Sequence, residues 1–249
     1  MTAPPGVPET WAYTLTLNGR YAGTQDWLVR PDKGTLVARV QTDFGGTLPA
    51  GRRVQESRIQ PETGFSLAYA EAEGSSRKPQ FETVFDERSG LVTLRQGKDE
   101  AREPLLEGHH DPLSLLLWLR RLPQVGQQEG EPPEGEHPGT RLAEYPEPRL
   151  VTVRMVGGRV HLQPLPGGEV LGLRARVYFL RPGGAYAYIE AAAPHRILRL
   201  IQPSDFGPVE ALIILEQAAG AREQQRSGGH NAAVRPVRGQ VGKPRRRGK

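Results

Sequence analysis

The sequence predicts a mostly β protein: an antiparallel curved sheet, either a half-barrel or a sandwich, with one central α-helix at about residues 111–122. Two observations predict this fold. About eleven or twelve short segments alternate apolar and polar residues with the period of a β-strand, and Gly, Pro or Asp separates them. One segment, "DPLSLLLWLRRLP", breaks this period because apolar residues cover nearly every face of the helix it would form.

The strands predicted before the helix follow one another as hairpins. The segment "WAYTLTLNG" alternates Trp11, Tyr13 and Leu15 with small or hydroxylated residues, so one face of the strand is apolar. Asn18-Gly19 follows directly, and this dipeptide is the strongest short signal of a two-residue hairpin turn. The alternation recurs in "GTLVARVQT", "RRVQESRIQ", "GFSLAYAEAEG" and "PQFETVFDERSGLVTLRQG".

The helix is predicted by its end signals as well as by its composition. Asp111 is a good N-cap, and Pro112 at the first helical position loses no hydrogen bond. Pro123 ends the helix, and Arg120 and Arg121 lie where the helix dipole favours cations. Because most faces of this helix must be covered by protein, we expect it to fill the concave face of the sheet.

The strands predicted after the helix complete the sheet. Two of them flank Gly157-Gly158 in "RLVTVRMVGGRVHLQ", and two more flank "RPGG" in "LRARVYFLRPGGAYAYIE". The segments "RILRLIQ" and "VEALIILE" end the series. We expect a disordered N-terminus at 1–10, a β domain at 11–216 with an acidic loop at 124–139, and a disordered basic tail at 217–249.

The charge is distributed unevenly. Residues 221–249 hold nine Lys and Arg against one Glu, a net charge of +8, whereas the remaining residues hold 24 basic against 27 acidic side chains, a net charge of −3. A basic tail of this kind binds polyanions or is only solvated. The candidate polyanion-binding residues are Arg235, Arg238, Lys243, Arg245, Arg246, Arg247 and Lys249.

Neither metal binding nor catalysis is predicted. His109 and His110 precede the cap residue Asp111, but adjacent residues rarely face one ion and no third ligand stands out, so we expect a solvated loop there. The chain has no cysteine. The segment "GFSLA" lacks the second glycine of a nucleophile elbow, and its Ser66 lies in a predicted strand. We therefore expect no cofactor, no catalytic residue and no enzyme activity.

The N-terminal segment "MTAPPGVPET" has neither the basic nor the apolar region of an export leader, and no segment has the roughly 18 apolar residues of a membrane span. The chain as written is therefore expected in the cytoplasm without a transmembrane segment. An upstream start codon that encodes a leader would change this expectation to the cell envelope.

The order of the motifs resembles a bacterial family of domains of unknown function. The similar pieces are "WAYTLTLNGRYAG", "DPLSLLLWLRRLP", the Gly-Gly hairpin, "LPGGEVLGLRARVY" and "AYIEAAAPHRILRLI". The resemblance covers about residues 11–216 and implies a β half-barrel similar in architecture to the periplasmic lipoprotein carriers LolA and LolB, which hold acyl chains against a concave sheet. This chain departs from the family in its N-terminus, its acidic loop and its basic tail.

These observations favour a non-enzymatic binding protein of β half-barrel architecture whose partner is an apolar ligand or a protein. The candidate ligand-binding residues are Trp11, Tyr13, Leu116 and Trp118, and the alternative for each of them is a place in the core. A second hypothesis is a nucleic-acid-binding protein that is indifferent to sequence and acts through the tail. Enzyme activity is the third hypothesis and ranks last, because no nucleophile or base can be assigned.

Overall fold

A computed structural model describes residues 7–74, 76, 78–106, 108–122, 150–155 and 158–215. Its strands and its helix all belong to the unit Met1–Ile213, and of the second unit, Ile214–Lys249, only Ile214 and Leu215 are described. The predicted acidic loop, the basic tail and all seven candidate polyanion-binding residues lie outside the described residues. In the part of the chain that is described, no helix is both long enough and apolar enough to cross a membrane.

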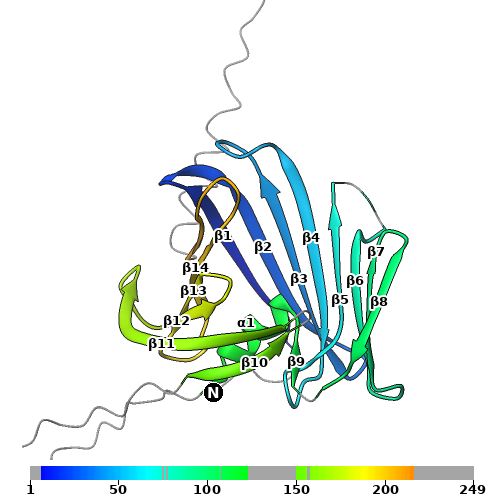
Figure 1. The fold of residues 1–249 in the computed structure, drawn as a ribbon. Coiled ribbons are helices and arrows are strands. Elements are labelled where there is room, and N and C mark those ends of the chain that lie inside the picture. Colours follow the sequence, from blue (N-terminus) through cyan, green and yellow to red (C-terminus); the bar gives the residue numbers. More distant parts are fainter. Residues whose placement is uncertain are drawn as a thin grey trace, which may run out of the picture. The chain divides into compact units, whose positions relative to one another are not determined.

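The described residues form one sheet of fifteen strands around a short helix (Figure 1). The first arm of the sheet consists of β1 (Glu9–Leu17), β2 (Arg20–Asp32), β3 (Thr35–Phe44), β4 (Gly51–Ile59), β5 (Ser66–Glu73), β6 (Phe81–Asp86), β7 (Leu91–Gln96) and β8 (Asp99–Pro104). The second arm consists of β9 (His109–His110), β10 (Val151–Met155), β11 (Gly158–Val170), β12 (Leu173–Arg181), β13 (Ala185–Glu190), β14 (Ile197–Gln202) and β15 (Val209–Ile213).

Every strand pairs with its neighbours in sequence except that β8 does not pair with β9, and β1 pairs with β15 where the two arms meet. The strand order therefore runs from β8 through β1 and β15 to β9. All pairs are antiparallel except β9 with β10. Because β8 and β9 do not pair, the curved sheet is unclosed, as predicted for a half-barrel and unlike a sandwich of two sheets.

The core lies between the inner face of this sheet and the helix. The inward positions of β1 are Tyr13, Leu15 and Leu17, all buried, and β13 and β14 contribute the buried Ala187, Ile189, Ile197, Leu198 and Leu200. The turn after β1 has positive φ at both Asn18 and Gly19, which a type I′ hairpin requires. The predicted fold class, a mostly β protein with one central helix, is confirmed by these elements.

The helix α1 spans Pro112–Leu119, which is shorter than the predicted 111–122. Asp111 is its N-cap, as predicted, and Arg120 is its C-cap. The residues that follow form a tighter turn, in which the Arg121 and Leu122 amides donate three residues back. All five leucines of α1 are buried, but Trp118 is only partly buried, although we expected cover on nearly every face.

The structure has more strands than the eleven or twelve predicted, and the two edge strands explain part of the difference. In β8 every side chain except that of Glu103 is exposed, so this strand has no apolar face to give an alternating pattern. The strand β9 contains only two residues. The solvated loop expected at His109 and His110 is wrong, because both side chains are buried, with exposed fractions of 6% and 1%.

Candidate ligand-binding pocket

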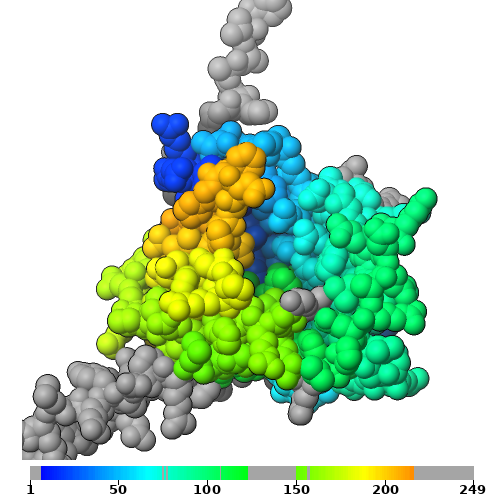
Figure 2. Space-filling view, viewed as in Figure 1, coloured from blue at the N-terminus to red at the C-terminus, as the bar shows by residue number. Residues whose placement is uncertain are grey.

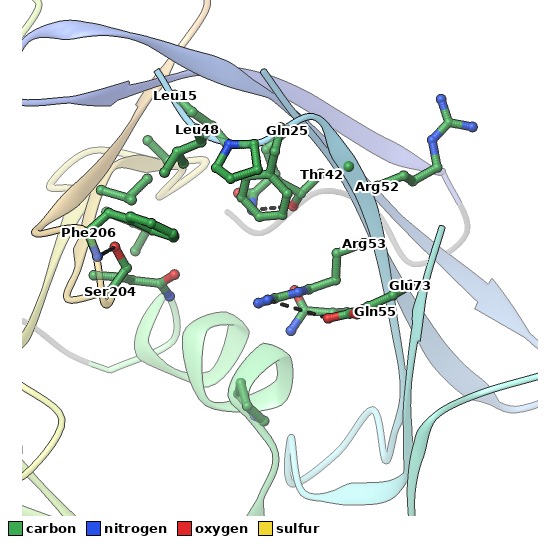
Figure 3. A pocket seen from close by; sticks show the side chains of 18 of the residues that line it. Leu15, Gln25, Thr42, Leu48, Arg52, Arg53, Gln55, Glu73, Ser204 and Phe206 are labelled. Atoms are coloured by element: carbon green, nitrogen blue, oxygen red, sulfur yellow. Dashed lines mark hydrogen bonds and ion pairs between the residues drawn. The ribbon is translucent and has the colours of Figure 1, made fainter. Parts of the chain in front are cut away.

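A pocket of about 560 Å³ lies between the inner face of β1–β5, the helix α1 and the loop after β14. Figure 2 shows the opening as a hollow between that loop, in orange, and the blue strands of the first arm. Figure 3 shows the lining, with α1 below, the loop after β14 on one side and β4 on the other. The pocket exists because α1 fills only part of the concave face.

Apolar side chains form the floor and one wall of the pocket. The helix contributes Leu113 and Leu116, which are buried beneath the pocket. Further apolar lining comes from Leu15, Trp27, Leu48, Leu200, Val209 and Ala211. Phe206, in the loop after β14, points toward the pocket and has an exposed fraction of 61% (Figure 3). The hydroxyl of Ser204 donates to the carbonyl of Gly207 at 2.6 Å and so holds this loop closed.

The opposite wall is polar. Gln25 donates from Nε2 to Thr42 Oγ1 at 3.0 Å and accepts at Oε1 from the Trp27 indole at 2.8 Å. Gln55 donates from Nε2 to the hydroxyl of Tyr69 at 2.7 Å. These side chains stand on neighbouring strands β2 to β5, so the sheet itself fixes their positions.

The charges on this wall are balanced. Arg53 Nε lies 3.2 Å from Glu71 Oε1, and Arg53 Nη2 lies 3.9 Å from Glu73 Oε1. The neighbouring Arg52 pairs with Asp43 at 2.6 Å, and the hydrogen bond from this guanidinium lowers the pKa of the Asp43 carboxyl. In Figure 3 the side chain of Arg53 points into the pocket, whereas that of Arg52 points away from it. Arg53 is therefore the pocket's one inward cation among the described residues, and two carboxylates compensate it.

The four ligand-binding residues predicted from the sequence have different places. Leu116 lines the pocket. Tyr13 is fully buried and donates its hydroxyl to the Ile197 carbonyl at 2.8 Å, and burial raises its pKa. Trp11 packs edge to face on Trp27, with ring centroids 6.3 Å apart, and the Arg120 guanidinium lies over the Trp11 ring, 4.7 Å from its centroid.

Trp118 faces a different part of the molecule from the pocket. Its ring lies 5.2 Å from the His110 ring, and a side chain at Gly64 would come within 3.1 Å of it. Trp11, Tyr13 and Trp118 are thus not among the lining residues, although the first two contact Trp27, which is.

Sequence reasoning missed the polar wall. On β4, the inward positions are Arg53, Gln55 and Ser57, followed by the buried Ile59. The sequence contains a signal for this wall, because Arg53, Gln55 and Ser57 share a strand face with Ile59, an apolar residue expected to be buried. Their partners Glu71 and Tyr69 lie on β5, so the pairing becomes visible only once the register of β4 and β5 is known.

A second polar cluster lies where α1 begins, and it is closed. The carboxylate of Asp111 accepts hydrogen bonds from the hydroxyls of Ser57 and Ser66 at 2.6 and 2.7 Å, and from the amides of Leu113 and Ser114 at 2.8 and 3.0 Å. Asp111 has an exposed fraction of 2%. Burial raises its pKa, although these hydrogen bonds act in the opposite direction.

His110 borders this cluster. Its Nδ1 lies 3.3 Å from Ser114 Oγ, and its ring packs on Phe65 and Trp118. Burial, with a smaller contribution from the neighbouring His109, lowers its pKa from 6.5 to about 4. Within the described residues, no three His, Asp or Glu side chains come together as a group that could hold a metal ion. The hydrogen bonds from the Leu113 and Ser114 amides to Asp111 connect this cluster to the start of α1.

No protein-family model and no curated protein sequence matches this chain. Among solved structures, the fold is similar to the crystal structure of a beta-barrel-like protein of the domain of unknown function DUF1849 from Brucella abortus. The two share 11% sequence identity and a TM-score of 0.50, and the match covers 85% of this chain and 98% of that one. The chain thus has the β-barrel-like fold of a bacterial domain of unknown function, as the sequence motifs predicted.

Proposed function

We propose that this protein is a non-enzymatic binding protein whose pocket holds one apolar or amphipathic small molecule. The observation that carries the proposal is the division of the pocket into an apolar floor with one apolar wall and a polar wall on β2–β5. A volume of about 560 Å³ is in the range of small-molecule sites, which are mostly apolar with a few convergent polar groups. The beta-barrel-like fold is consistent with a binding role.

The ligand that fits best has an aliphatic body and one uncharged polar end. The body would contact Leu113 and Leu116, and the polar end would lie near Gln55 and Arg53. A charged end fits less well, because the Arg53 guanidinium is already compensated by Glu71 and Glu73. A hydroxyl, amide or ester group would gain hydrogen bonds without disturbing this balance.

The lining also favours binding over catalysis. No histidine is present among the described residues that line the pocket. The Ser204 hydroxyl donates to the Gly207 carbonyl and Thr42 Oγ1 accepts from Gln25, and neither hydroxyl is hydrogen-bonded to a carboxylate or imidazole among the described residues.

The test compares two leucines of α1. Leu116 and Leu117 have the same exposed fraction, 6%, but only Leu116 lines the pocket. Leu116→Ala should weaken the binding of a fluorescent, uncharged long-chain ester about tenfold, whereas Leu117→Ala should leave binding within about twofold, while both lower the stability of the fold by about 2–5 kcal/mol. Equal effects on probe binding would contradict the proposal. Absence of binding to the wild-type chain would favour a protein partner instead.

A further inference from the structure

The outer face of β10, β11 and β12 carries a cluster of basic side chains that the pocket does not use. Arg154 on β10 lies directly opposite Arg159 on β11, and His161 on β11 lies directly opposite Arg181 on β12. These side chains lie opposite to the inward, buried residues Val153 and Leu162 on the same strands. We define Arg154, Arg159, His161 and Arg181 as the basic patch.

The basic patch places two arginines, Arg154 and Arg159, directly opposite one another. Two arginines of the first arm lie opposite acids instead: Arg39 lies opposite Glu56 with 3.6 Å between N and O, and Arg95 lies opposite Glu100 at 3.0 Å. Within the described residues, no ion pair joins Arg154, Arg159 or Arg181 to an acid. Like charges directly opposite one another destabilise a sheet. An anionic partner would remove this cost.

Aromatic rings adjoin the basic patch. The Arg181 guanidinium lies 5.0 Å from the centre of the Phe179 ring, and the Phe179 and Tyr186 rings lie 4.7 Å apart with a tilt of 30°. Three flat groups on β12 and β13 therefore contact one another beside the cations. Cationic surfaces with aromatic rings are typical of proteins that bind single-stranded nucleic acids, because the cations neutralise phosphates and the rings stack on bases.

We propose that the basic patch binds single-stranded nucleic acid without sequence preference. Arg154 and Arg159 would contact successive phosphates, and Phe179 and Tyr186 with Arg181 would stack on a base. This site uses the outer face of the second arm and none of the residues that line the pocket.

The test measures fluorescence anisotropy of a short labelled DNA strand of mixed sequence with the full chain, at several salt concentrations from ~50 mM upward. The variant Arg154→Gln/Arg159→Gln should bind about tenfold more weakly. Its salt slope, d log K/d log[salt], should fall by about 1.4, because each phosphate contact on a single strand contributes about 0.7. Thermal unfolding should show that the variant is as stable as the wild type, since a like-charge pair has been removed.

The matched control is Arg20→Gln/Arg88→Gln, which removes the same charge from two exposed arginines outside the basic patch. It should lower affinity less than twofold. A third variant, Phe179→Leu/Tyr186→Leu, should weaken binding without changing the salt slope, because it removes stacking and no charge. Equal losses in the two arginine variants, unchanged binding in the patch variant, or no binding by the wild type would overturn the proposal. Binding to anionic phosphatidylglycerol vesicles is measured with the same variants. If Arg154→Gln/Arg159→Gln weakened binding to these vesicles but not to the DNA strand, the proposal would also be overturned.

Discussion

Two polar clusters share the inward face of β4 and have opposite characters. Ser57 is fully buried and donates to Asp111, whereas Gln55 and Arg53, two and four residues earlier, line the open pocket. The side chain of Arg53 has an exposed fraction of 41%. The Asp111 cluster uses its polar groups within the protein to hold the start of α1, while the pocket wall keeps room beside its polar groups for another molecule.

The largest expected effect is on the closed cluster. Asp111→Ala removes the N-cap and leaves two hydroxyls and two amides without their shared acceptor, so we expect the free energy of unfolding to fall by about 3–4 kcal/mol. Chemical denaturation measures this loss. Asp111→Asn, which keeps an acceptor oxygen, should recover part of it. A loss below about 1 kcal/mol for Asp111→Ala would show that the cluster does not hold the helix.

The second expected effect is a dependence of stability on pH that comes from His110. Because its pKa is about 4 in the folded protein and 6.5 ordinarily, the unfolded chain binds the proton first as pH falls. Stability is therefore lost between pH 6.5 and about 4, with about 2 kcal/mol lost at pH 5.

The measurement compares thermal unfolding of wild type, His110→Gln and His109→Gln from pH 7 to pH 5. Only His110→Gln should lack this loss. Asp111, whose pKa is raised, contributes with the opposite sign, since its folded form binds a proton more readily; it is present in all three proteins, so the difference between them isolates His110. A loss that persists in His110→Gln would assign the pH dependence to another group.

Structural features that depend on neighbours in the chain could be predicted from the sequence, but contacts between residues far apart in the sequence could not. The capping signals at Asp111 and Pro112 and the turn at Asn18-Gly19 depend on neighbours in the chain, and the structure confirms them. Ser57 and Ser66 lie 54 and 45 residues from Asp111, and only strand register brings them to its carboxylate. The same holds for the pocket wall, whose residues come from four strands.

The third expected effect concerns the open wall. Arg53→Met leaves Glu71 and Glu73 without their cation, so the pocket becomes acidic. We expect a fatty acid to bind about tenfold more weakly, a difference of about 1.4 kcal/mol, while a fatty alcohol of the same length changes by less than about threefold. Competition with the fluorescent ester measures both. Arg52→Met, whose native side chain points away from the pocket, is the control and should change neither ligand.

The smallest effects come from two adjacent inward positions of β4. Ser57→Ala removes one of four donors to Asp111, so stability should fall by about 1 kcal/mol with no change in probe binding. Gln55→Met should instead change probe binding while stability falls only slightly. The Tyr69 hydroxyl keeps its hydrogen bond to Glu71 at 2.9 Å, so the fold loses less than about 0.5 kcal/mol, while the preference for ester over plain alkane probes falls about threefold. If Ser57→Ala altered probe binding as much as Gln55→Met, the two clusters would act as one, and the closed cluster would have to be counted as part of the ligand site.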